Sequence, residues 1–150
     1  MIEGARTIKG GLDMVFTRLL ARVDDASTDL LWRPDPTWNT YAGLIKHICH
    51  TARGYLSRIS GLEIEIVTGP DQWSETGSDR DSLRALIQGT REFADRALGS
   101  MTEATWREPI DLYGRPATKA DVAMFAVTHS AEHIGHMKLM DRVRKQQAGA

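Results

Sequence analysis

The sequence predicts an all-α protein built as a four-helix bundle, and two observations lead to this expectation. Four separate segments carry apolar residues at steps of three and four, the spacing that lines one face of an α-helix. No strand is expected between most of these segments, and only two connections favour a short extended loop or a small hairpin. Helices with one apolar face bury those faces against one another, so we expect a bundle rather than an α/β fold.

The first helix is predicted from an apolar stripe near the N-terminus. Gly10 and Gly11 precede this stripe, and because glycine is a poor helix former they leave the start of the helix undefined. The stripe consists of Leu12, Phe16, Leu19 and Val23.

The second helix is expected over about residues 40–60. Asn39 or Thr40 supplies a side-chain oxygen for its N-cap, and Gly61 is suited to end it. The third helix is expected to open at Ser78, and acidic residues follow in its first turn, where the helix dipole favours negative charge.

The fourth helix is expected to open at Thr118, because Asp121 three residues later completes a variant of the capping box. It runs to about Arg144, where basic side chains gather at the negative end of the helix dipole. Residues 144–150 are expected to form a frayed tail.

Two connections favour extended backbone. Residues 64–67 are rich in β-branched side chains and predict a short extended loop, and residues 109–116 predict a small hairpin. Trp73 and Trp106 lie in such loop-rich regions, where exposed aromatic side chains often mark contacts with a partner.

Length and charge limit the classes of function. A chain of 150 residues fits one domain, residues 1–150. Its net charge of −1 provides no attraction for DNA or RNA, so no nucleic-acid partner is expected. The sequence shows no secretory signal and no apolar run of the roughly 20 residues that span a bilayer. Together with the single cysteine, Cys49, these features predict a cytoplasmic protein with no membrane partner.

The histidines are confined to two short segments. His47 and His50 lie in the second helix, and His129, His133 and His136 lie in the fourth. A spacing of four residues places His129 and His133 one above the other on the apolar face of their helix. Both imidazoles are therefore expected to point into the bundle.

Two histidines at this spacing on a helix commonly act as two ligands of one transition-metal ion. His47 is the candidate for a third ligand, because it lies on the apolar side of the second helix beside Leu44 and Ile48. Three neutral imidazoles suit Zn²⁺, Ni²⁺, Fe²⁺ or Cu²⁺, and the sequence does not choose among them. Three protein ligands also leave one position open for water or substrate.

The alternative is that these histidines are hydrogen-bonded core residues without a metal. His136 lies one turn beyond the pair, and His50 lies about 60° around its helix from His47. We consider His136 and His50 as candidate catalytic groups that face the substrate or support a ligand, and equally as partly exposed surface residues. Cys49 lies on nearly the opposite side of its helix and is expected to be a buried, unreactive residue.

Other catalytic motifs are absent from the sequence. A zinc peptidase of the H-E-x-x-H type needs a glutamate where this chain has Ser130. No histidine follows a glutamate by three positions, as a di-iron bundle requires. The sequence also contains no phosphate-binding loop, no dinucleotide fingerprint and no serine nucleophile elbow.

Three stretches together resemble the DinB/YfiT-like superfamily of metal-binding four-helix bundles. The first joins residues 31–34 to residues 38–40, the second is GLIKHICHTARGY at residues 43–55, and the third is THSAEHIGHMKLM at residues 128–140. The third stretch resembles the family pattern H-x-x-x-H-x-G. The chain departs from the commonest pattern by having His136 where glutamine is frequent and Glu132 where histidine is frequent.

The resemblance implies a bundle that holds a divalent metal with His47, His129 and His133 and that often forms a homodimer. Characterised relatives include transferases and isomerases that use a low-molecular-weight thiol such as glutathione, mycothiol or bacillithiol. Because such thiols carry carboxylates, a basic pocket would favour this function. Candidate contacts are Arg53, Arg58 and Arg115.

Three functions therefore stay open at this point. The first is a metal-dependent transferase in which a thiol co-substrate binds at the open metal position and attacks a small-molecule substrate. The second is metal-assisted hydrolysis by a bound water. The third is a metal-binding or dimerisation module without catalysis.

Overall fold

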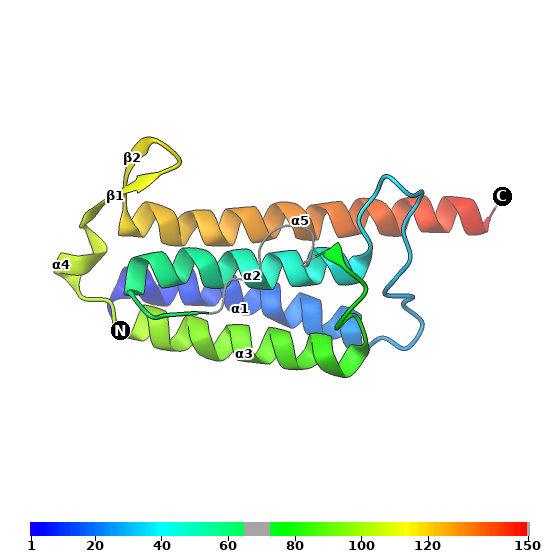
Figure 1. Ribbon diagram of the computed structural model, residues 1–150, viewed down its shortest axis with the longest axis horizontal. Helices are drawn as coiled ribbons and strands as arrows, with labels where there is room; N and C mark the ends of the chain where they lie inside the picture. Colours follow the sequence, from blue (N-terminus) through cyan, green and yellow to red (C-terminus); the bar gives the residue numbers. More distant parts are fainter. Residues whose placement is uncertain (65–72, 150) are drawn as a thin grey trace.

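The computed structural model describes residues 1–64 and 73–149 and shows four long helices packed side by side (Figure 1). A short helix and a two-stranded hairpin connect the third long helix to the last one. The predicted four-helix bundle with a short hairpin is therefore confirmed. The elements are α1 (Glu3–Asp24), α2 (Tyr41–Ser60), α3 (Arg80–Gly99), α4 (Glu103–Trp106), β1 (Pro109–Leu112), β2 (Arg115–Thr118) and α5 (Lys119–Ala148).

Each long helix packs mainly against two neighbours. Helices α1 and α5 run in one direction and α2 and α3 in the other, as the colours in Figure 1 show. The main contacts join α2 to α3 and α5, and α1 to the same two helices. The result places α1 and α2 on one diagonal of the bundle, and the antiparallel pair α2 and α5 forms one of its sides.

The core lies between the four helices and is apolar. Its largest fully buried side chains include Phe16 on α1, Ile48 and Leu56 on α2, and Ile87 on α3. Burying such side chains is the main favourable term in folding. Among the described residues, no helix combines the length and apolar character needed to cross a bilayer.

Most of the helix ends lie at the residues that the sequence predicts. Thr40 Oγ1 accepts the amide of Gly43 at 3.0 Å, and Gly61 ends α2 with a φ of +74°, a conformation that suits glycine. Thr118 and Asp121 form the expected capping box of α5. Helix α3 differs, because Asp79 rather than Ser78 is its N-cap. The Ser78 side chain is buried and its hydroxyl donates to a backbone carbonyl instead.

Helix α1 begins at Glu3, so the glycine pair that made its start uncertain lies inside the helix. Buried Ala5 and Ile8 extend its apolar face toward the N-terminus, and this packing outweighs the low helix propensity of glycine. The two glycines differ in their surroundings. A Cβ on Gly10 would meet no heavy atom within 4 Å, whereas a Cβ on Gly11 would lie 2.9 Å from Val127 Cγ1.

The expected frayed tail is partly wrong, since α5 continues past Arg144 to Ala148. The Arg144 guanidinium donates to the Ser27 carbonyl at 3.2 Å and so ties this part of the helix to the loop after α1. Of the extended run expected at residues 64–67, all but the first residue lies outside the described residues.

The hairpin predicted at residues 109–116 forms from antiparallel β1 and β2. Its turn holds Tyr113 and Gly114, both with positive φ, of 55° and 77°. Two successive residues of this kind match the twist of a tight hairpin. Arg58 on α2 donates to the Asp111 carbonyl at 2.6 Å, which fastens the hairpin to the bundle.

The two glycines of α1 give a matched test of the helix packing. We expect Gly10→Ala to stabilise the protein by up to about 1 kcal/mol through higher helix propensity. Gly11→Ala gains the same propensity but pushes against the stiff Val127 side chain, an overpacking cost of about 1–3 kcal/mol. Urea denaturation followed by circular dichroism would measure the difference. Equal stabilisation by the two substitutions would contradict the close approach of α1 and α5.

Candidate metal centre

Three histidines converge where α2 packs against α5. His47 comes from α2, and His129 and His133 come from successive turns of α5. The His47 ring centre lies 5.2 Å from that of His129 and 4.6 Å from that of His133, and the last two ring centres are 4.6 Å apart. One nitrogen of each ring lies within 4.8 Å of the corresponding nitrogens of the other two. The three histidines that the sequence singles out therefore form one cluster.

The nitrogen positions fit a shared cation. His47 Nε2 and His129 Nε2 are 3.1 Å apart. Ligands held about 2.1 Å from one tetrahedral zinc ion would lie about 3.4 Å from each other, a similar separation. In the described part of the chain, His133 Nε2 is a buried ring nitrogen without a hydrogen-bond partner, an arrangement that costs free energy. A divalent ion held by the three rings would satisfy that nitrogen, so the cluster is consistent with a divalent metal site.

The surroundings keep two of these imidazoles neutral. Burial, followed by the charges of the neighbouring histidines, lowers the pKa of His133 to about 4. Burial and His47 also lower the pKa of His129 below its usual value. A neutral imidazole is the form that binds a metal, because protonation occupies its lone pair. These two rings therefore need not release a proton to bind a metal at neutral pH.

Aromatic side chains enclose the cluster from two sides. Trp73 stacks on His47 with ring centres 4.8 Å apart, and Phe125 stacks on His129 at 5.9 Å. Gly43 makes room for the tryptophan, since a Cβ at this position would lie 3.2 Å from the Trp73 ring. The sequence suggested Trp73 as a contact with a partner, but in the structure it contacts the histidine cluster. No local pattern predicts this, because the tryptophan lies far along the chain from His47.

Trp106, the other tryptophan proposed as a partner contact, is half-buried. It packs beside Gly4 of α1, where a Cβ would lie 2.8 Å from the Trp106 indole nitrogen. Its position is therefore explained by packing within the chain.

The two remaining histidines have different positions. His136 Nδ1 lies 3.2 Å from His133 Nδ1, so His136 adjoins the cluster. It also lines a cavity of about 410 Å³ with apolar neighbours that include Trp38, Leu44 and Met140. His50 faces a separate depression beside Lys46 and the residues before α3. Only His136 of the two is therefore placed beside the three-histidine cluster.

Cys49 is buried as expected, whereas Glu132 is exposed. Cys49 is fully buried, and burial raises the pKa of its thiol to about 12, so it is not a nucleophile at neutral pH. Glu132 is exposed on the flank of α5. Its negative charge favours protonation of His129, but this effect is weaker than the opposing effect of burial.

The three arginines considered as contacts for a thiol co-substrate have different surroundings. Arg58 binds the Asp111 carbonyl of the hairpin. The Arg53 guanidinium lies over the Phe93 ring, 5.7 Å from its centre. Arg115 is exposed on β2.

Comparisons with known proteins agree with this architecture. A family model described as the DinB superfamily matches residues 12–137, a stretch that contains all three clustered histidines. The fold is similar to the crystal structure of a DinB-like protein, YjoA, from Bacillus subtilis, with a TM-score of 0.66 and 22% sequence identity. That match covers 94% of this chain and 92% of the other. The comparison with curated proteins found no match.

The cluster predicts how metal binding depends on each histidine. We expect purified protein to bind about one divalent transition-metal ion per chain. His129→Ala and His133→Ala should each abolish tight binding, because two imidazoles hold an ion far less firmly than three. His50→Ala is the matched control and should keep full occupancy, since His50 faces a different depression. Elemental analysis after dialysis would measure this, and full occupancy in both cluster variants would contradict the site.

Proposed function

Because the chain belongs to the DinB superfamily and brings three histidines together, we propose that it is a metal-dependent transferase acting with a low-molecular-weight thiol. In this proposal, His47, His129 and His133 hold one divalent transition-metal ion. Zn²⁺, Ni²⁺ and Fe²⁺ all suit such a ligand set. The observation that carries the proposal is the convergence of the three imidazoles around the buried, unpartnered Nε2 of His133.

The ligand set supports a catalytic site more than a purely structural one. Three imidazoles leave one position of a tetrahedral ion open, whereas structural zinc sites use four protein ligands. A metal held here would lower the pKa of a bound thiol, so that the thiol would react as its thiolate. In the transfer, the sulfur forms a bond to an electrophilic carbon, and a leaving group departs with the electron pair of its broken bond. The thiol proton passes to a base of the protein.

His136 is the best-placed candidate for that base. Its Nδ1 lies 3.2 Å from His133 Nδ1, so the ring adjoins the cluster, and His136 would accept a proton at Nδ1 by giving up this contact. His136 is exposed and also lines the 410 Å³ cavity, so a proton taken up there can pass to solvent. His50 is less suitable because it lines another depression.

The cavity beside His136 suits the electrophilic partner. Its wall is formed mainly by Trp38, Leu44, Leu139 and Met140. A volume of about 410 Å³ is in the range of small-molecule sites, which are typically apolar with a few polar groups. We therefore propose that the electrophile has an apolar body that lies against these side chains.

A second candidate function is a metal-binding module without catalysis. One observation favours it: of the arginines proposed to bind the carboxylates of a thiol co-substrate, Arg58 binds the hairpin backbone and Arg53 lies over the Phe93 ring. The cytoplasmic location and the homodimer stay predictions from the sequence and from the family resemblance.

A cobalt-substituted protein separates the two candidate functions. Adding the correct thiol should produce a visible sulfur-to-cobalt charge-transfer band if the thiol binds at the metal. His47→Ala should remove the band, because loss of the third ligand changes the geometry of the open position. His136→Gln should keep metal binding but lower the rate of thiol transfer by about 10²-fold or more, as expected for loss of a general base.

Glutathione, mycothiol and bacillithiol are the thiols to test, each with a generic carbon electrophile for the rate measurement. A cobalt spectrum that none of the three thiols changes would contradict the transferase and favour the metal-binding module. Loss of metal in His136→Gln would show that His136 is needed for binding and would contradict its assignment as a base.

A further inference from the structure

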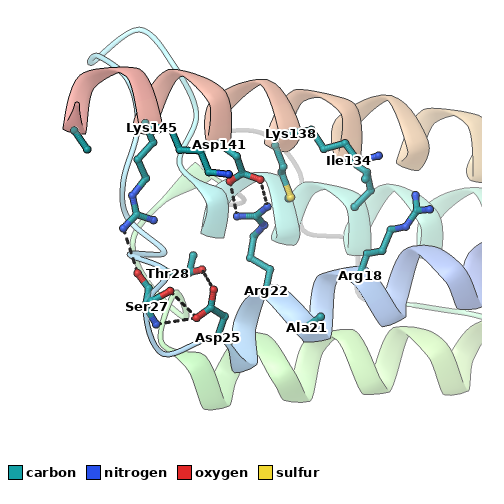
Figure 2. A pocket seen from close by; sticks show the side chains of 13 residues that line it. Arg18, Ala21, Arg22, Asp25, Ser27, Thr28, Ile134, Lys138, Asp141 and Lys145 are labelled. Atoms are coloured by element: carbon teal, nitrogen blue, oxygen red, sulfur yellow. Dashed lines mark hydrogen bonds and ion pairs between the residues drawn. The ribbon is translucent and has the colours of Figure 1, made fainter. Parts of the chain in front are cut away.

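A second cavity, of about 730 Å³, lies between α1 and α5 and shares no residue with the histidine cluster. Figure 2 shows Arg18 and Arg22 projecting from α1 toward α5, which carries Lys138, Asp141 and Lys145. The loop after α1 closes one end of the cavity through Ser27 and Thr28. The lining residues are Arg18, Ala21, Arg22, Asp25, Ser27, Thr28, Ile134, Met137, Lys138, Asp141, Arg144, Lys145 and Ala148.

The lining is strongly cationic, with five basic side chains and two carboxylates. Both carboxylates already have partners. Asp141 accepts hydrogen bonds from Arg22 at 2.6 and 2.9 Å and from the Tyr41 hydroxyl at 2.8 Å. Asp25 accepts from the Ser27 amide and hydroxyl and from the Thr28 hydroxyl. Asp141 is thus paired with Arg22, whereas the hydrogen bonds to Asp25 come from uncharged donors, and the five basic side chains still outnumber the two carboxylates.

Two of the cations have no counter-charge of their own. Within the described residues, Arg18 and Lys138 form no hydrogen bond and no ion pair. Lys145 is likewise without a hydrogen bond, although its charge helps to lower the pKa of Asp141. By contrast, Arg22 is held firmly, because its guanidinium pairs with Asp141 and lies over the Tyr41 ring at 4.4 Å. The cavity thus combines a fixed ion pair with unpaired cations.

The cavity also has an apolar side. Ile134 and Met137 are among the buried core residues, and the small side chains of Ala21 and Ala148 complete this part of the lining. An inorganic anion would leave the exposed Ala21 and Ala148 side chains in contact with water. A ligand with both an anionic head and an apolar body would match the two parts of the lining at once.

We propose that the cavity between α1 and α5 binds a small amphipathic anion, whose head group pairs with Arg18 and Lys138 and whose apolar body lies against Ala21, Ala148 and the exposed edges of Ile134 and Met137. A carboxylate and a phosphate share this head-group chemistry. The site is separate from the metal centre, because its residues lie on the side of α5 that faces α1, and the clustered histidines face α2.

Calorimetric titration of the full chain with octanoate and with octyl phosphate tests the proposal and distinguishes the two head groups. At least one should bind saturably with one site per chain. Octanol, which lacks the charge, and inorganic phosphate, which lacks the apolar body, should each bind at least about tenfold more weakly. Equal binding of octanol, or of inorganic phosphate, would overturn the proposal.

Variants locate the binding to this cavity. The double substitution Arg18→Gln and Lys138→Gln should weaken binding about tenfold or more, since each removes a charge-assisted contact. Arg142→Gln is the matched control, because Arg142 is exposed on the same helix but does not line the cavity. Binding should persist in His129→Ala, which excludes a carboxylate bound at the metal centre. Unchanged affinity in the double variant, or loss of binding in His129→Ala, would contradict the assignment.

Discussion

The antiparallel contact between α2 and α5 is the constraint on which the rest of this structure depends. It fixes which residues of the two helices lie opposite one another, in three successive layers. A shift of one helix by a single turn, about 5.4 Å, would take His47 away from at least one of His129 and His133. The three layers are Tyr41 with Asp141, His47 with His129 and His133, and Tyr55 with Phe125.

The middle layer places several polar nitrogens between packed helices, where such groups normally destabilise a fold. The outer layers compensate by holding the helices in register, one through a hydroxyl–carboxylate hydrogen bond and the other through aromatic packing. Tyr55 also donates to or accepts from the Tyr113 hydroxyl at 2.6 Å, which links the hairpin to the same contact. A bound cation would turn the unfavourable middle layer into a stabilising one, because ligation satisfies its nitrogens together.

The sequence predicts the features that depend on local spacing. The His129 and His133 pair, the caps at Thr40 and Thr118, and the hairpin each follow from residues a few positions apart. Features that depend on contacts between residues far apart in the sequence are not predicted by such local patterns. The start of α1 depends on the packing of Ala5 and Ile8 into the core, and the basic cavity joins side chains from α1 and α5, which are far apart in the sequence. No periodicity within one segment carries that information.

The central claim is that His47, His129 and His133 act together as one ligand set. X-ray absorption spectroscopy of the zinc-loaded protein tests it most directly, because the fine structure reports both the number of imidazole ligands and their distances. We expect three imidazole nitrogens about 2.0–2.1 Å from zinc and one further light atom or sulfur at the open position. A coordination shell with one imidazole or none, or one made of carboxylate oxygens, would contradict it.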